Sequence, residues 1–436
     1  MERNFICENI TVNDAGHLCL AGQDVVELAK EYGTPLYLMD EERIRERCRV
    51  FKDAVNVSLG DNAAVAYASK AASFKEIYRI MRDEKMFADV VSCGEIYTAK
   101  QAGFPLENAL FHSNNKTDTD IAFAMDVGVG YFVVDNEEEL FVIEREAEKR
   151  NITQKILLRI TPGIDSHTFA AVTTGKVDSK FGSAIKTGQA QKITETALGL
   201  NSVNLCGYHC HIGSQIFDKD VFLRAADIMT EFISDVKKSL GYEAEILDMG
   251  GGFGVRYLPT DPKVDIKNQV VNICERIKAS CKAAGIKLPL IIFEPGRSII
   301  ADAGMTVYTV GTVKKIPQFL NFVSVDGGMT DNVRHAMYKA NYMLLAANKM
   351  NEQCNMKANI AGRCCESGDI IQENVPVPTS IERGDTIACL TTGAYNYSMA
   401  SNYNRLPRPP IVMLTGGKSH VSVKRETFAD VCSLDE

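Results

Sequence analysis

The sequence predicts an α/β protein that consists of a (β/α)8 barrel and a second, β-rich domain. In the first three hundred residues, short β-rich runs alternate with amphipathic helical stretches. The first five runs begin roughly every 23 residues, about the length of a minimal strand-plus-helix unit. Eight such runs occur, which suits a barrel of about 250 residues. After Gly296, strands follow one another with turn signals between them, and helix is scarce.

The eight expected barrel strands are Ala63–Ala68, Met86–Val91, Ala109–His112, Tyr131–Asp135, Lys155–Ile160, Leu205–Cys210, Glu245–Met249 and Leu288–Phe293. Helical periodicity is clear between them. An i, i+3, i+4, i+7 stripe is formed by Phe74, Ile77, Tyr78 and Met81. Val221–Leu240 is expected to be a long helix that ends at Gly241. A doubly wound open sheet shows the same alternation, so strand counting alone leaves that alternative open.

We expect residues 41–295 to form the barrel, and residues 1–40 with 296–436 to form the β-rich domain. The expected strands of the second domain are Met305–Ile316, Phe319–Val325, Val375–Val377, Asp385–Leu390 and Ile411–Leu414. One helix is expected over Asn332–Asn348. The opening stretch, Phe5–Tyr37, is strand-like and lies outside the barrel count, so we expect it to pack with the C-terminal part.

Charge and composition narrow the classes of function. The 436 residues include 48 basic and 56 acidic side chains, a net charge of -8, which disfavours a nucleic-acid-binding surface. No apolar run approaches the roughly 20 residues that span a bilayer, and the first residues lack the features of a secretory signal. The 13 cysteines have no paired spacing, which favours reduced thiols in a cytoplasmic protein.

Candidate chemistry lies at the carboxyl ends of the expected strands, where a barrel places its active site. Polar or glycine residues occur there in nearly every unit: Lys70, Asp89, His112, Arg159, His209, His211, Gly250, Gly251, Gly252, Gly254, Glu294 and Arg297. A lysine at such a mouth can form a Schiff base with an aldehyde cofactor or a carbonyl substrate. The alternative for Lys70 is a simply solvated side chain.

The glycine-rich segment Asp248–Gly254 can present backbone N–H groups to an anion, although a tight turn is the alternative. It lacks the spacing of a dinucleotide-binding loop and of a Walker A loop. His209 and His211 could be a metal pair. We expect one to face the barrel interior and the other the helices, an arrangement that disfavours shared ligation, and we predict no metal. Glu294-Pro-Gly-Arg297 places an acid and a base at the last strand end, with a surface salt bridge as the alternative.

Together these motifs resemble those of the diaminopimelate decarboxylases, pyridoxal-phosphate enzymes of the alanine-racemase-like fold type. The matching stretches are Tyr67–Ala71, Ser179–Gly182, His209–Gln215, Gly250–Gly254, Glu294–Ser298, Asp326–Asp331, Cys365–Asp369, Gly393–Tyr395 and Ser398–Asn404. They run nearly end to end. The combination of Cys-Glu-Ser-Gly-Asp with Glu-Pro-Gly-Arg is highly specific, and the fold of the family, a barrel followed by a β domain, agrees with the strand pattern.

The resemblance implies pyridoxal 5′-phosphate as cofactor and a role for each matched residue. Lys70 would hold the cofactor covalently and move protons, His211 would stack on its ring, and Glu294 would keep the ring nitrogen protonated. Cys365 would donate a proton. The other residues expected around the cofactor are Asp89, Ser214, Gly250, Gly251, Gly252, Pro295, Gly296, Arg297 and Tyr395. The residues expected to bind substrate are Arg297, Arg334, Tyr338, Glu366 and Tyr395.

The resemblance also implies the decarboxylation of meso-2,6-diaminopimelate to L-lysine, the last step of lysine biosynthesis. It implies a homodimer with shared active sites that acts on a small amino acid and binds neither nucleic acid nor membrane. One alternative is a related decarboxylase of ornithine, arginine, carboxynorspermidine or a carrier-bound substrate. Another is a non-catalytic pyridoxal-phosphate-binding regulatory protein, which the intact Lys70, Cys365 and Glu294 disfavour.

Three residues beside the expected site depart from the pattern of the family. Cys93 and Ser113 stand where glycine is common, and Arg363 stands where proline is more frequent. The groups expected in the site are all retained despite these changes. The departures therefore leave the fine substrate preference open, whereas the class of reaction is unaffected.

Overall fold

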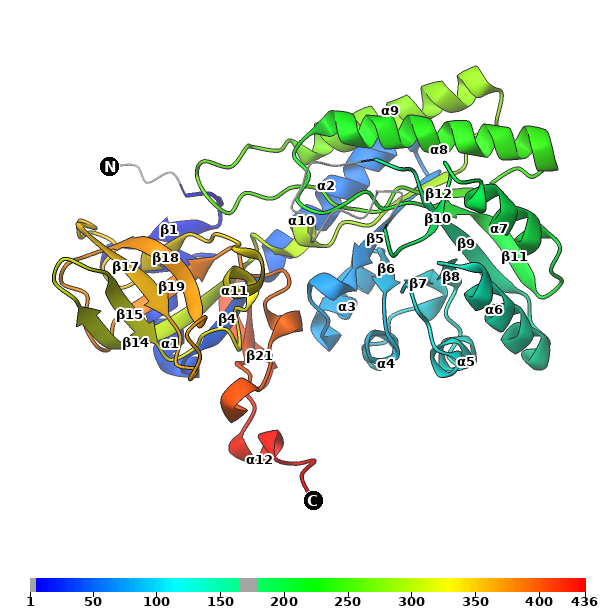
Figure 1. Cartoon of the computed structure of the whole chain (residues 1–436). Helices are drawn as coiled ribbons and strands as arrows, with labels where there is room; N and C mark the ends of the chain where they lie inside the picture. Colours follow the sequence, from blue (N-terminus) through cyan, green and yellow to red (C-terminus); the bar gives the residue numbers. More distant parts are fainter. Residues whose placement is uncertain (1–4, 165–178) are drawn as a thin grey trace. The chain divides into compact units, whose positions relative to one another are not determined.

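The computed structural model describes residues 5–164 and 179–436 (Figure 1). The chain divides into two compact units. The first comprises the residues up to Glu46 together with Val255–Lys263 and Ile299–Glu436, and the second comprises Arg47–Gly254 and Val264–Ser298. Among the helices in the described ranges, none is both long and apolar enough to cross a membrane.

The second unit is a closed barrel of eight parallel strands, which confirms the predicted fold class. The strands are β5 (Ala63–Ala68), β6 (Phe87–Val90), β7 (Ala109–Phe111), β8 (Tyr131–Val134), β9 (Gln154–Thr161), β11 (Val203–His209), β12 (Ile246–Asp248) and β13 (Leu290–Phe293). Each neighbours the next in that order. Pairing of β13 with β5 completes the ring, and a two-residue strand, β10 (Ser183–Ala184), pairs with β9.

Apolar side chains from around the barrel meet in one buried cluster. Its members are Ala66, Leu110, Val133, Leu157, Cys206, Ile246 and Ile292, and Phe87 of β6 packs against them. Because strand side chains alternate between faces, the residue two positions further along each strand also points inward. The barrel interior is therefore a packed apolar layer that lies beneath a second layer at the carboxyl ends of the strands.

Helices connect the strands and cover the outside of the barrel, as a parallel sheet requires. They are α2 (Glu41–Leu59), α3 (Lys75–Asp83), α4 (Cys93–Gln101), α5 (Asp118–Asp126), α6 (Glu137–Arg150), α7 (Gln189–Leu198), α8 (Lys219–Leu240), α9 (Ile266–Ala284) and α10 (Arg297–Ile300). The stripe expected in α3 is buried. As predicted, α8 ends at Gly241, which takes a left-handed conformation with φ of 68°. Figure 1 shows α8 and α9 side by side.

The first unit is rich in strands. A small sheet contains β1 (Ile10–Val12), β2 (Leu18–Leu20) and β3 (Gln23–Asp24). The larger sheet has the order β18–β17–β15–β14–β4–β20–β21, and β19 pairs with both β14 and β16. Its strands are β4 (Leu36–Asp40), β14 (Gly304–Lys315), β15 (Asn321–Val325), β16 (Leu344–Ala346), β17 (Met356–Ala361), β18 (Ile370–Val377), β19 (Thr386–Leu390), β20 (Ile411–Thr415) and β21 (Lys418–Val423).

One long strand organises this unit. The first half of β14 pairs with β4 and β19, and its second half pairs with β15 after a bulge near Val310. The core beneath it collects apolar side chains from both ends of the chain, including Leu18, Leu36, Val307 and Val412. The opening stretch therefore packs with the C-terminal part, as expected.

Two local expectations were wrong. The helix expected over Asn332–Asn348 is only α11 (Arg334–Tyr338), because Lys339 takes a left-handed conformation with φ of 52° and the apolar run after it pairs as β16 with β19. The opening stretch is not all strand, since it contains α1 (Val25–Tyr32). The side chain of Asp24 caps α1 by accepting hydrogen bonds from the N–H groups of Val26 and Glu27.

Candidate active site

Directly above the apolar layer, the barrel carries a ring of polar side chains. Two positions beyond the apolar residue of each strand, or three in β11, stand Asp89, His112, Asp135, Arg159, His209, Asp248 and Glu294, with Ala68 completing the ring. A bulge between Leu205 and Gly207 supplies the extra residue in β11. The bulge turns His209 inward, whereas Tyr208 packs against Phe232 of α8. Strand periodicity thus assembles a charged site at the mouth of the barrel.

Lys70 lies in a short 3-10 turn, Ser69–Ala71, that directly follows β5. Its Nζ atom is 2.9 Å from Oδ2 of Asp89, which is fully buried, while the lysine side chain itself is 45% exposed. The other oxygen of Asp89 has no hydrogen-bond partner among the described residues. A buried carboxylate therefore anchors an accessible amine at the mouth.

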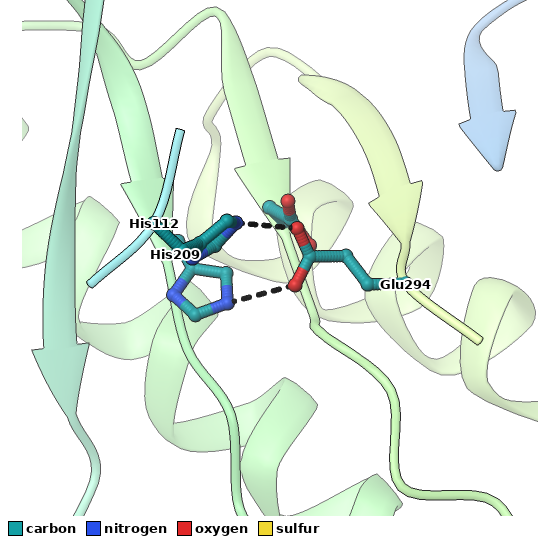
Figure 2. A group of neighbouring side chains, drawn as sticks. His112, His209 and Glu294 are labelled. Atoms are coloured by element: carbon teal, nitrogen blue, oxygen red, sulfur yellow. Dashed lines mark hydrogen bonds and ion pairs between the residues drawn. The ribbon is translucent and has the colours of Figure 1, made fainter. Parts of the chain in front are cut away.

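Glu294 follows β13 and is held by two buried imidazoles (Figure 2). Nε2 of His112 is 2.7 Å from Oε1, and Nε2 of His209 is 3.2 Å from Oε2. Figure 2 shows that each imidazole points to a different oxygen. Asp248 lies close by, with its Oδ1 accepting a hydrogen bond from the N–H of Gly250 at 2.8 Å.

Burial dominates the electrostatics of this cluster. It lowers the pKa of His209 to about 4, so this imidazole is neutral at pH 7. Burial, reinforced by the charge of Glu294, raises the pKa of Asp248 well above its ordinary range. Burial also acts to raise the pKa of Glu294, but the two histidines outweigh it and hold that pKa well below its ordinary value. The pKa values of the two neighbouring acids are therefore shifted in opposite directions, down for Glu294 and up for Asp248.

The expectation that one of the two neighbouring histidines would face the helices was wrong. Residues two positions apart on a strand share a face, and β11 in any case ends at His209. Nδ1 of His211 accepts a hydrogen bond from the N–H of Gly251 at 3.3 Å, which places its ring beside the glycine loop. Both histidines therefore belong to the mouth of the barrel.

The glycine loop packs too closely for side chains. A Cβ atom on Gly251 would lie 2.1 Å from the carbonyl oxygen of Glu294, and one on Gly252 would lie 2.2 Å from that of Gly213. Nearby, Nη2 of Arg297 donates a hydrogen bond to Oγ of Ser214 at 3.1 Å. A guanidinium, a hydroxyl and a backbone without side chains are the donor set that a phosphate requires.

In the β-rich unit, α11 and the segment after β19 form an aromatic cage around an arginine. The guanidinium carbon of Arg334 lies 5.3 Å from the ring centroid of Tyr338 and 5.3 Å from that of Tyr395. Arg334 is buried, and its Nε atom has no hydrogen-bond partner in the part of the chain that the structure describes. Such a donor is suited to a carboxylate.

Cys365 and Glu366 lie in a loop of the same unit, between β17 and β18. Asp369 fixes this loop by accepting hydrogen bonds from the N–H groups of Met329 at 2.6 Å and Cys364 at 2.7 Å. Cys365 is exposed, and its own N–H donates to Oδ1 of Asn404 at 2.8 Å. The loop thus presents a thiol and a carboxylate on a rigid backbone.

Two of the departures from the family pattern are explained locally. Cys93 starts α4, and its Sγ donates to Oδ1 of Asp120 at 3.1 Å, while burial raises the pKa of this thiol to about 12. Ser113 has φ of 152°, in a region that favours glycine, and its Oγ accepts a hydrogen bond from the N–H of Asn115. Nothing in the structure explains Arg363.

Sequence reasoning placed Lys70, Asp89, His211, Ser214, Glu294 and Arg297 at strand ends or in matched motifs, and all six lie in the barrel unit. It also placed His112 at a strand end and Asp248 at the start of the glycine-rich segment, but it gave neither residue a role. The residues present also fit pyridoxal phosphate, since Lys70 supplies an amine, Ser214 and Arg297 supply phosphate donors, and Glu294 supplies a carboxylate.

A closed (β/α)8 barrel with this donor set at its mouth defines a pyridoxal-phosphate-dependent decarboxylase, and residues 41–301 match the family described as pyridoxal-dependent decarboxylase, pyridoxal binding domain. The chain is 45% identical to a diaminopimelate decarboxylase of Bacillus methanolicus over 95% of this chain and 96% of that one. It is 44% identical to that of Bacillus subtilis over 97% and 96% of the two chains. The chain belongs to the diaminopimelate decarboxylase family.

Solved structures agree. A diaminopimelate decarboxylase from M. jannaschii, solved in complex with L-lysine, superposes with a TM-score of 0.91 at 33% identity, covering 98% of each chain. The corresponding enzyme from Helicobacter pylori, also solved with L-lysine, has a TM-score of 0.85 at 30% identity, covering 94% of this chain and 98% of that one. The likeness therefore extends over the barrel and the β-rich unit.

Proposed function

We propose that this chain decarboxylates meso-2,6-diaminopimelate to L-lysine, with pyridoxal 5′-phosphate as cofactor. The observation that carries the proposal is the identity of 44% and 45% to diaminopimelate decarboxylases over nearly the whole chain. The solved relatives in complex with L-lysine support the product. The site residues expected from the sequence then take the following roles.

When bound, pyridoxal phosphate supplies an electron sink for the charge that remains at the substrate Cα after CO2 leaves. Lys70 holds the cofactor through Nζ, and His211 packs against its ring. The glycine loop, Ser214, Pro295, Gly296 and Arg297 hold the phosphate and ring. Glu294 holds a proton at the ring nitrogen, since its low pKa keeps it ionised and so able to accept that N–H bond.

The β-rich unit supplies the groups for the substrate. A diaminopimelate molecule has two amino-acid ends, of which one reacts and the other must be held by fixed charges. Arg334, between Tyr338 and Tyr395, binds a carboxylate, and Glu366 binds the distal ammonium group. Cys365 is exposed, and its Sγ donates the proton that replaces the lost CO2 at Cα.

The proposed active unit is a two-fold homodimer in which each barrel takes Cys365 and Glu366 from its partner. The exposure of Cys365 supports this proposal. A thiol that donates a proton in an active site shielded from water must be covered, and the partner subunit would supply that cover. We also place the enzyme in the cytoplasm, because all thirteen cysteines are free thiols, which a reducing compartment maintains.

A substrate panel tests the proposal. The holoenzyme is supplied with meso-, LL- and DD-diaminopimelate, ornithine and arginine, and CO2 release is measured for each. We expect release from meso-diaminopimelate alone, with lysine as the other product. Faster CO2 release from ornithine or arginine would show that the proposed substrate is wrong, although the protein would still be an amino-acid decarboxylase. Cofactor binding with no release from any of them would favour a regulatory protein.

A further inference from the structure

Two imidazoles hold the carboxylate of Glu294 from two sides, which is more than hydrogen bonding of a single oxygen would require. They come from two different strand ends, β7 and β11, and each reaches a different oxygen of one carboxylate. Their rings also meet edge to face, with centroids 4.7 Å apart and planes at 71°. All three side chains are nearly fully buried. The carboxylate is therefore fixed in both position and rotation.

The tautomer of His209 follows from its surroundings. Its Nδ1 atom is buried and has no hydrogen-bond partner among the described residues. A proton on Nδ1 would be buried without an acceptor, so the neutral ring carries its proton on Nε2 and donates it to Glu294. His209 is thus a fixed donor.

The neighbouring acid, Asp248, shows that the histidines determine which of the two carboxyl groups is ionised. The carboxyl groups of Asp248 and Glu294 belong to one buried cluster with His112 and His209. One nitrogen or oxygen atom from each of these four side chains lies within 4.8 Å of the others. Two carboxylates this close cannot both be ionised in a buried site. Glu294 faces two imidazole N–H donors, whereas Asp248 accepts one backbone N–H, and its second oxygen has no hydrogen-bond donor among the described residues. The single charge therefore settles on Glu294.

We propose that His112 and His209 are positioning residues, which keep Glu294 ionised and oriented for the cofactor ring while Asp248 carries the proton. The proposal rests on the proposed function, because it assigns Glu294 to the ring nitrogen. The other titratable groups that face the cluster are Asp89, whose Oδ1 is 3.9 Å from Nε2 of His112, together with Asp135, Arg159 and His211. Lys70 acts through its ion pair with Asp89.

A pair of variants at His112 separates the hydrogen bond from the shape. His112→Gln retains an N–H donor that can reach Glu294, whereas His112→Phe fills the site without a donor. We expect His112→Phe to lower kcat by about ten- to a hundred-fold, the range for a lost hydrogen bond to a charged group, with KM nearly unchanged. His112→Gln should recover most of that loss. His17→Phe, which removes a histidine–carboxylate pair of 2.9 Å in the β-rich unit, is the matched control and should leave kcat unchanged.

A second readout does not depend on activity. In cofactor-free protein, the infrared difference between wild type and Glu294→Gln isolates the Glu294 carboxyl group. At pH 7 we expect the band of an ionised carboxylate, and in His112→Phe we expect the band of a protonated acid. If wild type fails to decarboxylate meso-diaminopimelate, the proposed function falls, but this measurement still decides the role of the histidines.

Two outcomes would overturn the proposal. One is an ionised Glu294 band in His112→Phe. The other is a His112→Gln variant as slow as His112→Phe, which would make ring shape the important property. If His112→Phe fails to fold, variants of the two carboxyl groups test the proposal instead. Asp248→Asn mimics the protonated acid and should lower kcat far less than Glu294→Gln, and equal losses in these two variants would contradict the assignment of the proton.

Discussion

Nζ of Lys70 lies 2.9 Å from Oδ2 of Asp89, so a fully buried carboxylate holds an amine that remains accessible. This pair joins the ends of two neighbouring parallel strands, β5 and β6. Burial of the acid alone would be costly, and the ion pair offsets that cost while directing the lysine toward the mouth. The geometry gives Lys70 a fixed starting position for covalent chemistry.

The first prediction concerns that lysine. Borohydride reduction of the holoenzyme should attach the cofactor covalently to Lys70, and peptide mass mapping would locate it. Lys70→Ala should abolish both the covalent label and the visible absorbance of the cofactor, because the amine that forms the bond is removed. Labelling of another lysine in the wild-type protein would refute the assignment.

The second prediction concerns shared sites. Lys70→Ala and Cys365→Ala are each expected to be inactive. When they are unfolded and refolded together at equal ratio, random pairing makes about half the dimers mixed, each with one intact site, so roughly a quarter of wild-type activity should return. Activity is measured as CO2 release, and mass spectrometry confirms the mixed dimers. Mixed dimers with background activity would mean that both groups come from one chain.

A third prediction concerns pH. Burial raises the pKa of Asp331 from 3.8 to about 7, although Tyr308 donates a hydrogen bond of 2.6 Å to its Oδ1. The folded protein therefore binds this proton more tightly than the unfolded chain does. The resulting stability is fully present below about pH 4 and is lost as pH rises to about 7.

The corresponding measurement is urea unfolding of wild type and Asp331→Asn at pH 5 and pH 7. Between these two values the Asp331 contribution should fall by about 2 kcal/mol, because the slope of about 1.4 kcal/mol for each unit of pH lessens as the pH approaches the pKa of the folded state. The variant should lack this part of the pH dependence. Parallel pH profiles for the two proteins would show that Asp331 does not titrate as described.

The fourth prediction concerns a buried ion pair in the barrel. Nζ of Lys116 donates to Oε1 of Glu139 at 2.8 Å and to the carbonyl oxygen of Val133 at 2.7 Å, and neither charged side chain is appreciably exposed. Lys116→Met should lower the free energy of unfolding by about 3–5 kcal/mol, because it leaves a buried charge without a partner. Lys116→Met combined with Glu139→Leu should recover much of that loss. A double variant no more stable than Lys116→Met would argue against this explanation.

The sequence was most informative where periodicity is strong. All eight barrel strands lie within two residues of their expected bounds, because short apolar runs separated by helices have few other arrangements. The polar ring follows from the same period of two. The role of His112 in that ring was not predicted, because it depends on the contact with Glu294, which is 182 residues away along the chain.

Other features depend on local backbone conformation, which residue patterns do not reveal. The bulge at Gly207 changes which face His209 occupies, and a left-handed residue at Lys339 ends a helix that the sequence predicted to continue to Asn348. The missed strands β17 and β21 are stabilised mainly by their neighbours in the sheet. Sheet pairing between distant segments leaves little trace in a single sequence.

The position of β4 has a consequence for the order of folding. Residues 36–40 pair on one side with β14 and on the other with β20, which begins at Ile411. During synthesis, the strands of the barrel emerge in succession and can pair soon after they leave the ribosome, because each neighbour is local except in the pair β13 and β5 that closes the ring. The N-terminal strand instead waits for β14 and gains its second partner only when almost the whole chain has been made. A ribosome stalled before residue 411 should therefore carry a protease-resistant barrel and a protease-sensitive N-terminal segment.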